Sequence, residues 1–253
     1  MEVKFIGVGE AFDEEYPNTS IQVEAEEGGI EHCILLDCGF TVPPLFWKSC
    51  PDGERLDAVW ISHFNGDHFL GLPALIARFW QLGRQKPLLV IGLPGVEQIV
   101  TQTIGLAYPS VLAKLGYELR FIEMQPGKVL MRAGFVWRSA PNAHSRSDLA
   151  VRIDCGGKSL FYSGDGAPTE DSVLLARGAD LAVHEAFRMS EPSPGHSTVS
   201  KCIDFARSAQ VKRLALVHLE RNERRRREQI FPMIRAVSEL EVFLPEPGDK
   251  IRI

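Results

Sequence analysis

The sequence has no run of about 18 apolar residues, and its first residues, Met1-Glu2-Val3-Lys4-Phe5, do not have the layout of a secretory signal. We therefore expect a soluble, cytoplasmic protein that has no membrane partner. Positive charge is not in excess either. The formal net charge of −5 argues against a general nucleic-acid binder, and no low-complexity tract is present.

Cysteine is scarce and irregularly placed. The five cysteines are an odd number and include no Cys-x-x-Cys pair, which argues against a disulfide framework and against a thiolate zinc site. Reduced thiols in the cytosol fit this pattern. Cys38, in Leu35-Leu36-Asp37-Cys38-Gly39, is expected to be a buried free thiol rather than a metal ligand.

Hydrophobic periodicity predicts a strand-rich opening and then alternating strands and helices. The expected strands cover residues 3–7, 19–23, 33–36, 58–61, 87–91, 119–124, 129–132, 135–139, 149–153, 160–162, 181–184 and 214–217, and the expected helices cover 72–80, 95–104, 172–176 and 199–206. A final helix is expected between 223 and 238, where Pro232 must start, kink or split it. No linker interrupts the chain. The pattern predicts one domain over residues 1–253, an α/β fold in which two sheets pack face to face with helices outside, as a four-layer αββα sandwich.

The densest group of metal-capable side chains lies in the segment His63-Phe64-Asn65-Gly66-Asp67-His68. His63, Asp67 and His68 follow a predicted buried strand and precede a predicted amphipathic helix. A short loop that is fixed at both ends can hold a preorganised metal site. A polar turn is the alternative interpretation of the segment taken alone.

Four more candidate side chains follow predicted strands or precede a helix. His144 follows the strand at 135–139, Asp165 follows 160–162, His218 follows 214–217, and His196 precedes the helix at 199–206. Loops that leave one edge of a sheet meet in space, and enzymes of the α/β class build their sites there. We expect these side chains to meet the 63–68 segment.

The same segments carry a resemblance to a known family. The relevant segments are Phe5-Ile6-Gly7-Val8-Gly9-Glu10-Ala11, residues 56–75, Tyr162-Ser163-Gly164-Asp165, Val183-His184-Glu185-Ala186, Gly195-His196-Ser197-Thr198 and Leu216-Val217-His218. In this order, and across nearly the whole chain, they resemble the ribonuclease Z branch of the metallo-β-lactamase superfamily. The superfamily motif His-x-His-x-Asp-His is matched at His63, Asp67 and His68.

The resemblance implies two adjacent metals. One would be held by His63, His144 and Asp165, and the other by Asp67, His68, Asp165 and His218, so that Asp165 bridges them. Imidazole and carboxylate ligands suit Zn²⁺, and less often Mn²⁺ or iron. The resemblance also suggests a homodimer.

Two departures from the family pattern bear on function. Asn65 stands where the motif has its second histidine, and a neutral amide oxygen is a poor ligand for zinc, so this site should bind metal weakly and one metal or two can be present. The second departure is that residues 145–164 alone separate His144 from Asp165. This leaves no room for the long arm that many ribonuclease Z enzymes use to hold transfer RNA.

The resemblance also implies a proton-transfer pair. His196 would act at the scissile phosphate as an acid or a phosphate clamp, and Glu185 would orient it. The start of the following helix should lower the affinity of His196 for its proton. Arg221 is the expected substrate-binding residue because it lies close to His218, whereas Arg224-Arg225-Arg226-Arg227 are expected to form a solvated helix face.

These observations predict a metal-dependent hydrolase, and a phosphodiesterase on a small or nucleotide-like phosphodiester in particular. Metal-bound hydroxide would attack phosphorus, with Asp67 orienting or deprotonating it. The alternatives are a transfer-RNA 3′-processing endoribonuclease, a lactone or thioester hydrolase, and a non-catalytic binding or accessory protein with a degenerate metal site. Asn65 is the feature that keeps the last of these open.

Overall fold

A computed structural model describes all 253 residues. Its first sheet has seven strands in the order β14-β1-β2-β3-β4-β5-β6. These are β1 (Glu2–Gly7), β2 (Ser20–Glu27), β3 (Ile30–Leu36), β4 (Leu56–Ile61), β5 (Leu88–Gly92), β6 (Leu119–Glu123) and β14 (Lys250–Arg252). From β14 to β3 the pairs are antiparallel, and from β3 to β6 they are parallel.

The second sheet repeats this plan with seven strands in the order β13-β12-β11-β10-β9-β8-β7. They are β7 (Val129–Arg132), β8 (Phe135–Pro141), β9 (Leu149–Cys155), β10 (Lys158–Tyr162), β11 (Leu181–Glu185), β12 (Arg213–Val217) and β13 (Glu241–Phe243). The pairs from β7 to β10 are antiparallel and those from β10 to β13 are parallel. The ends of β8, β10, β11 and β12 and the start of β9 therefore lie at one edge.

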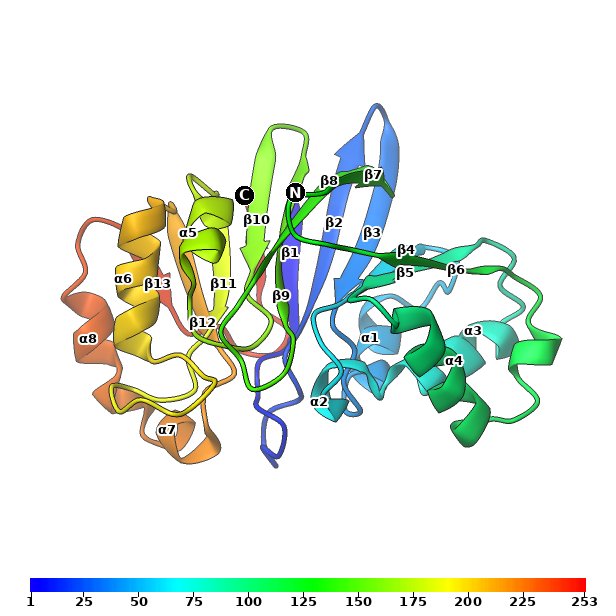
Figure 1. Cartoon of the computed structure of the whole chain (residues 1–253), viewed down its shortest axis with the longest axis horizontal. Coiled ribbons are helices and arrows are strands. Elements are labelled where there is room, and N and C mark those ends of the chain that lie inside the picture. Colours follow the sequence, from blue (N-terminus) through cyan, green and yellow to red (C-terminus); the bar gives the residue numbers. More distant parts are fainter.

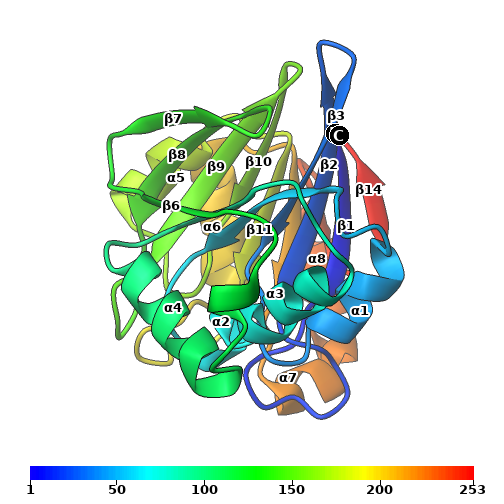
Figure 2. The ribbon, with the colours of Figure 1, turned by 90° about the vertical axis from the view of Figure 1, so that its right-hand side faces the viewer.

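The helices cover the outer faces of the two sheets (Figure 1). On the first sheet lie α1 (Pro43–Ser49), α3 (Leu72–Gln81) and α4 (Val96–Ala107), and on the second lie α5 (Glu170–Ala176), α6 (Val199–Ala209) and α8 (Phe231–Arg235). The short helices α2 (Gly66–Phe69) and α7 (Arg221–Arg225), and the 3₁₀ turns Leu112–Lys114 and Arg227–Gln229, complete the fold. Figure 2, turned by 90°, shows the two sheets facing each other. The predicted four-layer α/β sandwich is confirmed.

Three apolar clusters hold these layers together. Along β3, Ile34 and Leu36 join the cluster between the sheets, whereas Leu35 joins the cluster under α1, α3 and α4. This alternation is the period of two that a strand imposes, and both faces are buried because both are covered. Between the sheets the rings of Trp60 and Trp137 stack with centroids 6.3 Å apart.

The helix α6 shows how sequence sets one of these elements. Its apolar residues Val199, Cys202, Ile203 and Ala206 recur at helical spacing and belong to the cluster between the second sheet and its helices. Thr198 caps the helix, since its side chain accepts a hydrogen bond from the backbone N–H of Lys201 at 3.2 Å.

The C-terminal region differs from the prediction. In place of one helix between 223 and 238, the chain forms α7, a 3₁₀ turn and α8, and Pro232 lies in the first turn of α8. Proline at this position lacks only an N–H that a helix start leaves unpaired, so it starts the helix rather than kinking it. The strands β13 and β14 were not predicted. No helix is both long enough and apolar enough to cross a membrane. The single-domain interpretation of residues 1–253 stays a prediction.

Candidate metal centre

The candidate side chains gather at the edge where the strand ends meet. His63 follows β4, Asp67 and His68 lie on α2, Asp165 follows β10, and His218 follows β12. We expected a loop at Asp67 and His68, and the chain forms a single helical turn there. This turn packs closely on the segment after β3, where a Cβ on Gly39 would collide with the carbonyl oxygen of Asp67. Glycine is therefore required at 39.

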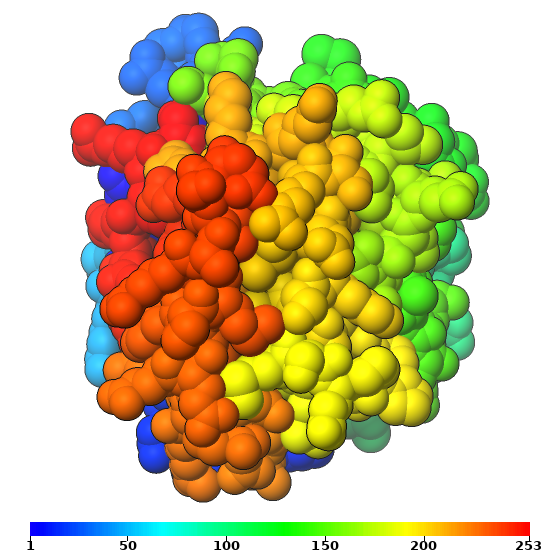
Figure 3. Space-filling model, turned by 90° about the vertical axis from the view of Figure 1, so that its left-hand side faces the viewer, coloured from blue at the N-terminus to red at the C-terminus, as the bar shows by residue number.

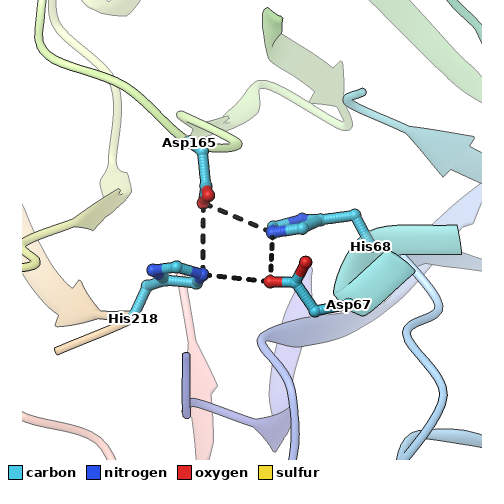
Figure 4. Close-up of side chains that lie close together, drawn as sticks. All are labelled: Asp67, His68, Asp165 and His218. Atoms are coloured by element: carbon cyan, nitrogen blue, oxygen red, sulfur yellow. Dashed lines mark hydrogen bonds and ion pairs between the residues drawn. The ribbon is translucent and has the colours of Figure 1, made fainter. Parts of the chain in front are cut away.

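Four side chains form the tightest group, Asp67, His68, Asp165 and His218 (Figure 4). The Nε2 atom of His68 lies 3.1 Å from Asp67 Oδ2 and 3.4 Å from Asp165 Oδ1. His218 Nε2 lies 3.3 Å and 3.4 Å from the same two oxygens. All four side chains are buried. Two imidazoles and two carboxylates facing one point are a ligand set for a divalent metal.

A second group consists of His63, His144 and Asp165. His63 Nε2 lies 3.9 Å from Asp165 Oδ2, the oxygen that does not face His68 and His218. The two oxygens of Asp165 therefore face different groups. Asn65 lies beside this group, with its Nδ2 atom 3.3 Å from His144 Nε2.

Several polar atoms that face these groups have no hydrogen-bond partner, although they are buried. They include the Nε2 atoms of His63 and His68 and Oδ1 of Asp165. Burying polar atoms without partners is unfavourable. A divalent cation in the first group would satisfy His68 Nε2 and Asp165 Oδ1, and one in the second group would satisfy His63 Nε2, so the residues present fit a metal.

The other ring nitrogens of His63, His68 and His144 face acceptors that the sequence did not predict. His68 Nδ1 lies 2.7 Å from Asp37 Oδ2, and His63 Nδ1 lies 3.0 Å from Asp148 Oδ2. His144 Nδ1 donates to the carbonyl oxygen of Gly195 at 2.7 Å. An acceptor at Nδ1 keeps the proton there and leaves the Nε2 lone pair for a metal.

Asp37 could have been found from the sequence, because it ends the strand β3 just as the recognised residues end theirs. It adopts a left-handed backbone conformation with φ 58°, which is uncommon outside glycine and marks a constrained position. Besides His68, its carboxylate accepts hydrogen bonds from Ser62 and from the Tyr162 hydroxyl at 2.7 Å. Asp148 precedes a strand and carries no comparable signal.

The electrostatics follow from burial and the close carboxylates. Burial opposes charge on His68 and His218, but Asp165 and Asp67 outweigh it, so the pKa of His68 lies well above its ordinary value and that of His218 rises to about 9. Burial and the neighbouring His68 lower the pKa of His63 to about 4. His63 therefore stays neutral and offers a lone pair.

Glu185 and His196 lie beside the metal-ligand groups. His196 Nδ1 forms an ion pair with Glu185 Oε1 at 3.3 Å. The Glu185 carboxylate also accepts hydrogen bonds from the backbone N–H groups of Gly166, Ser197 and Phe187, at 3.0, 2.8 and 2.9 Å. These bonds fix the carboxylate beside the imidazole.

The prediction that the helix start lowers the pKa of His196 is wrong. Burial opposes its charge, but Glu185 outweighs burial and raises the pKa of His196. The ring of Phe187 stacks on that of His196 with centroids 4.4 Å apart. His184, by contrast, is fully buried against Phe161 and Phe205.

The arginines after His218 lie in different surroundings. Arg221 Nη1 donates to Glu10 Oε1 at 3.1 Å, and its role in substrate binding stays a prediction. The interpretation of 224–227 as a solvated helix face is wrong at Arg224, which is only 2% exposed. All five cysteines are buried and free, as expected for Cys38.

Comparison with known proteins agrees with this geometry. The family model of the beta-lactamase superfamily domain matches residues 32–219. The chain belongs to the metallo-β-lactamase superfamily, in its ribonuclease Z-like branch. It is 26% identical to a protein named ribonuclease Z from Methanosarcina acetivorans over 87% of each chain, and 26% identical to a ribonuclease Z from Methanothermobacter thermautotrophicus over 95% of each.

Solved structures show the same fold. The short form of human tRNase Z superposes with a TM-score of 0.80 at 23% identity and covers 100% of this chain and 99% of its own. A metallo-beta-lactamase fold protein from Bacillus subtilis gives a TM-score of 0.79 at 21% identity, with 99% of each chain covered. The superfamily assignment makes the chain a member of a hydrolase family whose fold implies a divalent metal.

Proposed function

We propose that this chain is a metal-dependent phosphodiesterase whose substrate is RNA, with transfer-RNA 3′ processing as the specific reaction to test. The sequence alone ranked a small or nucleotide-like phosphodiester first. The relatives named ribonuclease Z, which align over 87–95% of the chain, favour the RNA alternative instead. Net charge is a weak argument against this because a local surface can bind RNA.

The observation that carries the proposal is the division of the Asp165 carboxylate. One oxygen faces His68 and His218, and the other faces His63. Such a carboxylate can bridge two cations. Asp67, His68, Asp165 and His218 would hold one metal, and His63, His144 and Asp165 would hold the other, without a ligand from Asn65.

The proposed metal is Zn²⁺, since imidazole and carboxylate ligands suit it, and Mn²⁺ and iron are the alternatives. Divalent metals at such a centre lower the pKa of water and neutralise charge that develops on a phosphoryl group.

The protein groups supply the proton transfers. Asp67 orients the attacking water and accepts its proton. His196 donates a proton to the departing oxygen, and Glu185 favours the protonated ring because it raises the pKa of His196. Glu185 holds the His196 ring, and Arg221 is the proposed contact for a substrate phosphate once it exchanges Glu10 for that group.

A small phosphodiester remains the second candidate substrate. The observation in its favour is that β9 and β10 occupy residues 149–155 and 158–162, so the stretch between His144 and Asp165 carries no arm to grip a large RNA.

The experiment compares a transfer-RNA precursor carrying a 3′ trailer, a dinucleotide and bis(4-nitrophenyl) phosphate, with metal content measured on the same protein. Cleavage at the 3′ end with a kcat/KM far above that for the small diester supports RNA. His196→Ala should lower kcat by about 10²–10⁴. Folded protein that carries metal but cleaves none of the three refutes catalysis and leaves the binding-protein alternative.

The oligomeric state belongs to the same proposal. The expected homodimer is tested by sedimentation of the purified protein, where a single species at the mass of one chain would contradict it.

A further inference from the structure

A cavity of about 240 Å³ lies between α7 and the loop that follows β1. Its lining is unusual for the number of arginines: it consists of Asp13, Glu15, Tyr16, Arg221, Arg224, Arg225 and Arg227. The loop and α7 adjoin at the lower edge of the molecule in Figures 2 and 3. None of these residues belongs to the His and Asp groups of the metal centre.

Arg224 is the central feature of this cavity. Its side chain is 2% exposed, and its guanidinium lies over the ring of Tyr16 at 4.4 Å. Nη2 donates to the carbonyl oxygen of Pro245 at 3.3 Å, but Nε and Nη1 are buried and have no acceptor. A buried cation that leaves two donors unpaired is unfavourable unless something else accepts those hydrogen bonds.

The other three arginines are fixed by acids. Arg221 pairs with Glu10 at 3.1 Å, Arg225 pairs with Glu14, and Arg227 pairs with Glu246. These acids do not line the cavity, whereas Asp13 and Glu15 do. The ion pairs hold these three guanidinium groups in place, and Arg224 is the one arginine of the lining that has no carboxylate partner.

We propose that this cavity binds a phosphate group, with Arg224 Nε and Nη1 as its principal donors. The planar fork of a guanidinium donates two parallel hydrogen bonds, which match two oxygens of a phosphate. A phosphate also has further oxygens for the arginines around it. The site lies close to the strand end that carries His218, because Arg221 is on its wall and is three residues away in the chain.

The test is titration calorimetry of the intact, metal-containing protein with inorganic phosphate. We expect two classes of site, one at the metals and one in the cavity. Arg224→Lys keeps the positive charge but loses the planar fork of donors. It should weaken phosphate binding in the cavity about tenfold or more and leave phosphate binding at the metals unchanged. The matched control is Arg235→Gln on α8, an exposed arginine outside the cavity, which should change neither class.

Arg225→Gln keeps the test decisive if Arg224→Lys does not fold. Arg225 is largely exposed on α7, and its loss should also weaken the cavity class, by a smaller factor. A single class of phosphate site in the wild type, or equal cavity affinities in wild type, Arg224→Lys and Arg225→Gln, would overturn the proposal.

Two sources of phosphate are separated by kinetics. If an RNA backbone supplies the group, Arg224→Lys raises KM for an oligoribonucleotide but not for bis(4-nitrophenyl) phosphate. If free phosphate occupies the cavity, both KM values stay the same although the calorimetric site is lost. The calorimetry does not depend on turnover, so its failure is distinct from failure of the proposed catalysis.

Discussion

Replacement of Asn65 by histidine tests the most consequential departure of this centre from its family. His144 Nδ1 donates to the Gly195 carbonyl, which can only accept, so Nε2 carries the lone pair and accepts from the Asn65 amide at 3.3 Å. A metal held by His63, His144 and Asp165 must first break that hydrogen bond. It then gains no imidazole from position 65.

The size of the effect follows from these contacts. A neutral hydrogen bond contributes about 0.5–1.5 kcal/mol, which alone weakens metal binding up to about tenfold. Asn65→His removes that competitor and adds a nitrogen ligand, which brings the donors to the four that zinc prefers. We expect the weaker metal of the pair to bind about 10- to 100-fold more tightly, in the range that changes around a metal site commonly produce.

Stoichiometry and affinity are measured by elemental analysis and by competition with a chromophoric chelator. Asn65→Leu is the matched control, since it removes the amide without adding a ligand. Its metal affinity should rise only by the part that comes from losing the hydrogen bond, at most about tenfold. Two equally tight metals in the wild type, or no gain in Asn65→His, would refute the reasoning.

Three further predictions concern other side chains of the centre and the core. Asp148→Asn removes the carboxylate beside Nδ1 of His63, a proposed metal ligand, and should weaken metal binding about 10- to 100-fold in a chelator competition, with unaltered folding by circular dichroism. Glu185→Gln removes the group that raises the pKa of His196; because the protonated ring is the proposed acid, activity is lost as pH rises through that pKa, and the basic limb of the kcat/KM profile should move to lower pH. If the basic limb of the profile does not move, the group that titrates there is not His196. Trp137→Ala empties the fully buried centre of the core and should lower the free energy of unfolding by about 3–5 kcal/mol in urea, whereas Trp80→Ala, at 39% exposure, should cost much less.

The sequence predicted most of the fold because its signals are local. Alternation in β3 and helical spacing in α6 come from residues that are neighbours in the chain. The strands β13 and β14 were missed because each has three residues and is fixed by its partner, β12 in one case and β1 in the other. For the last helix, the sequence left open whether Pro232 starts, kinks or splits it.

The metal-centre residues were predictable because each follows a strand end or flanks a helix, and the sheet order brings those ends to one edge. Arg224 was not. Its burial depends on Tyr16 and on the carbonyl of Pro245, which lie far from it in the chain. A run of arginines has the composition of a solvated surface, and only the tertiary structure shows that one member is enclosed.

The candidate centre also depends on the hydrogen-bond acceptors behind its imidazoles. Because of these acceptors, the ligand residues alone do not specify the site. A strand-end histidine can face a metal with either ring nitrogen. Asp37, Asp148 and the Gly195 carbonyl each take one Nδ1 hydrogen, and so they select Nε2 at His68, His63 and His144. These acceptors come from three separate loops. The three loops come together only in the folded protein, at this edge of the sheets, so a short sequence motif cannot predict their contact.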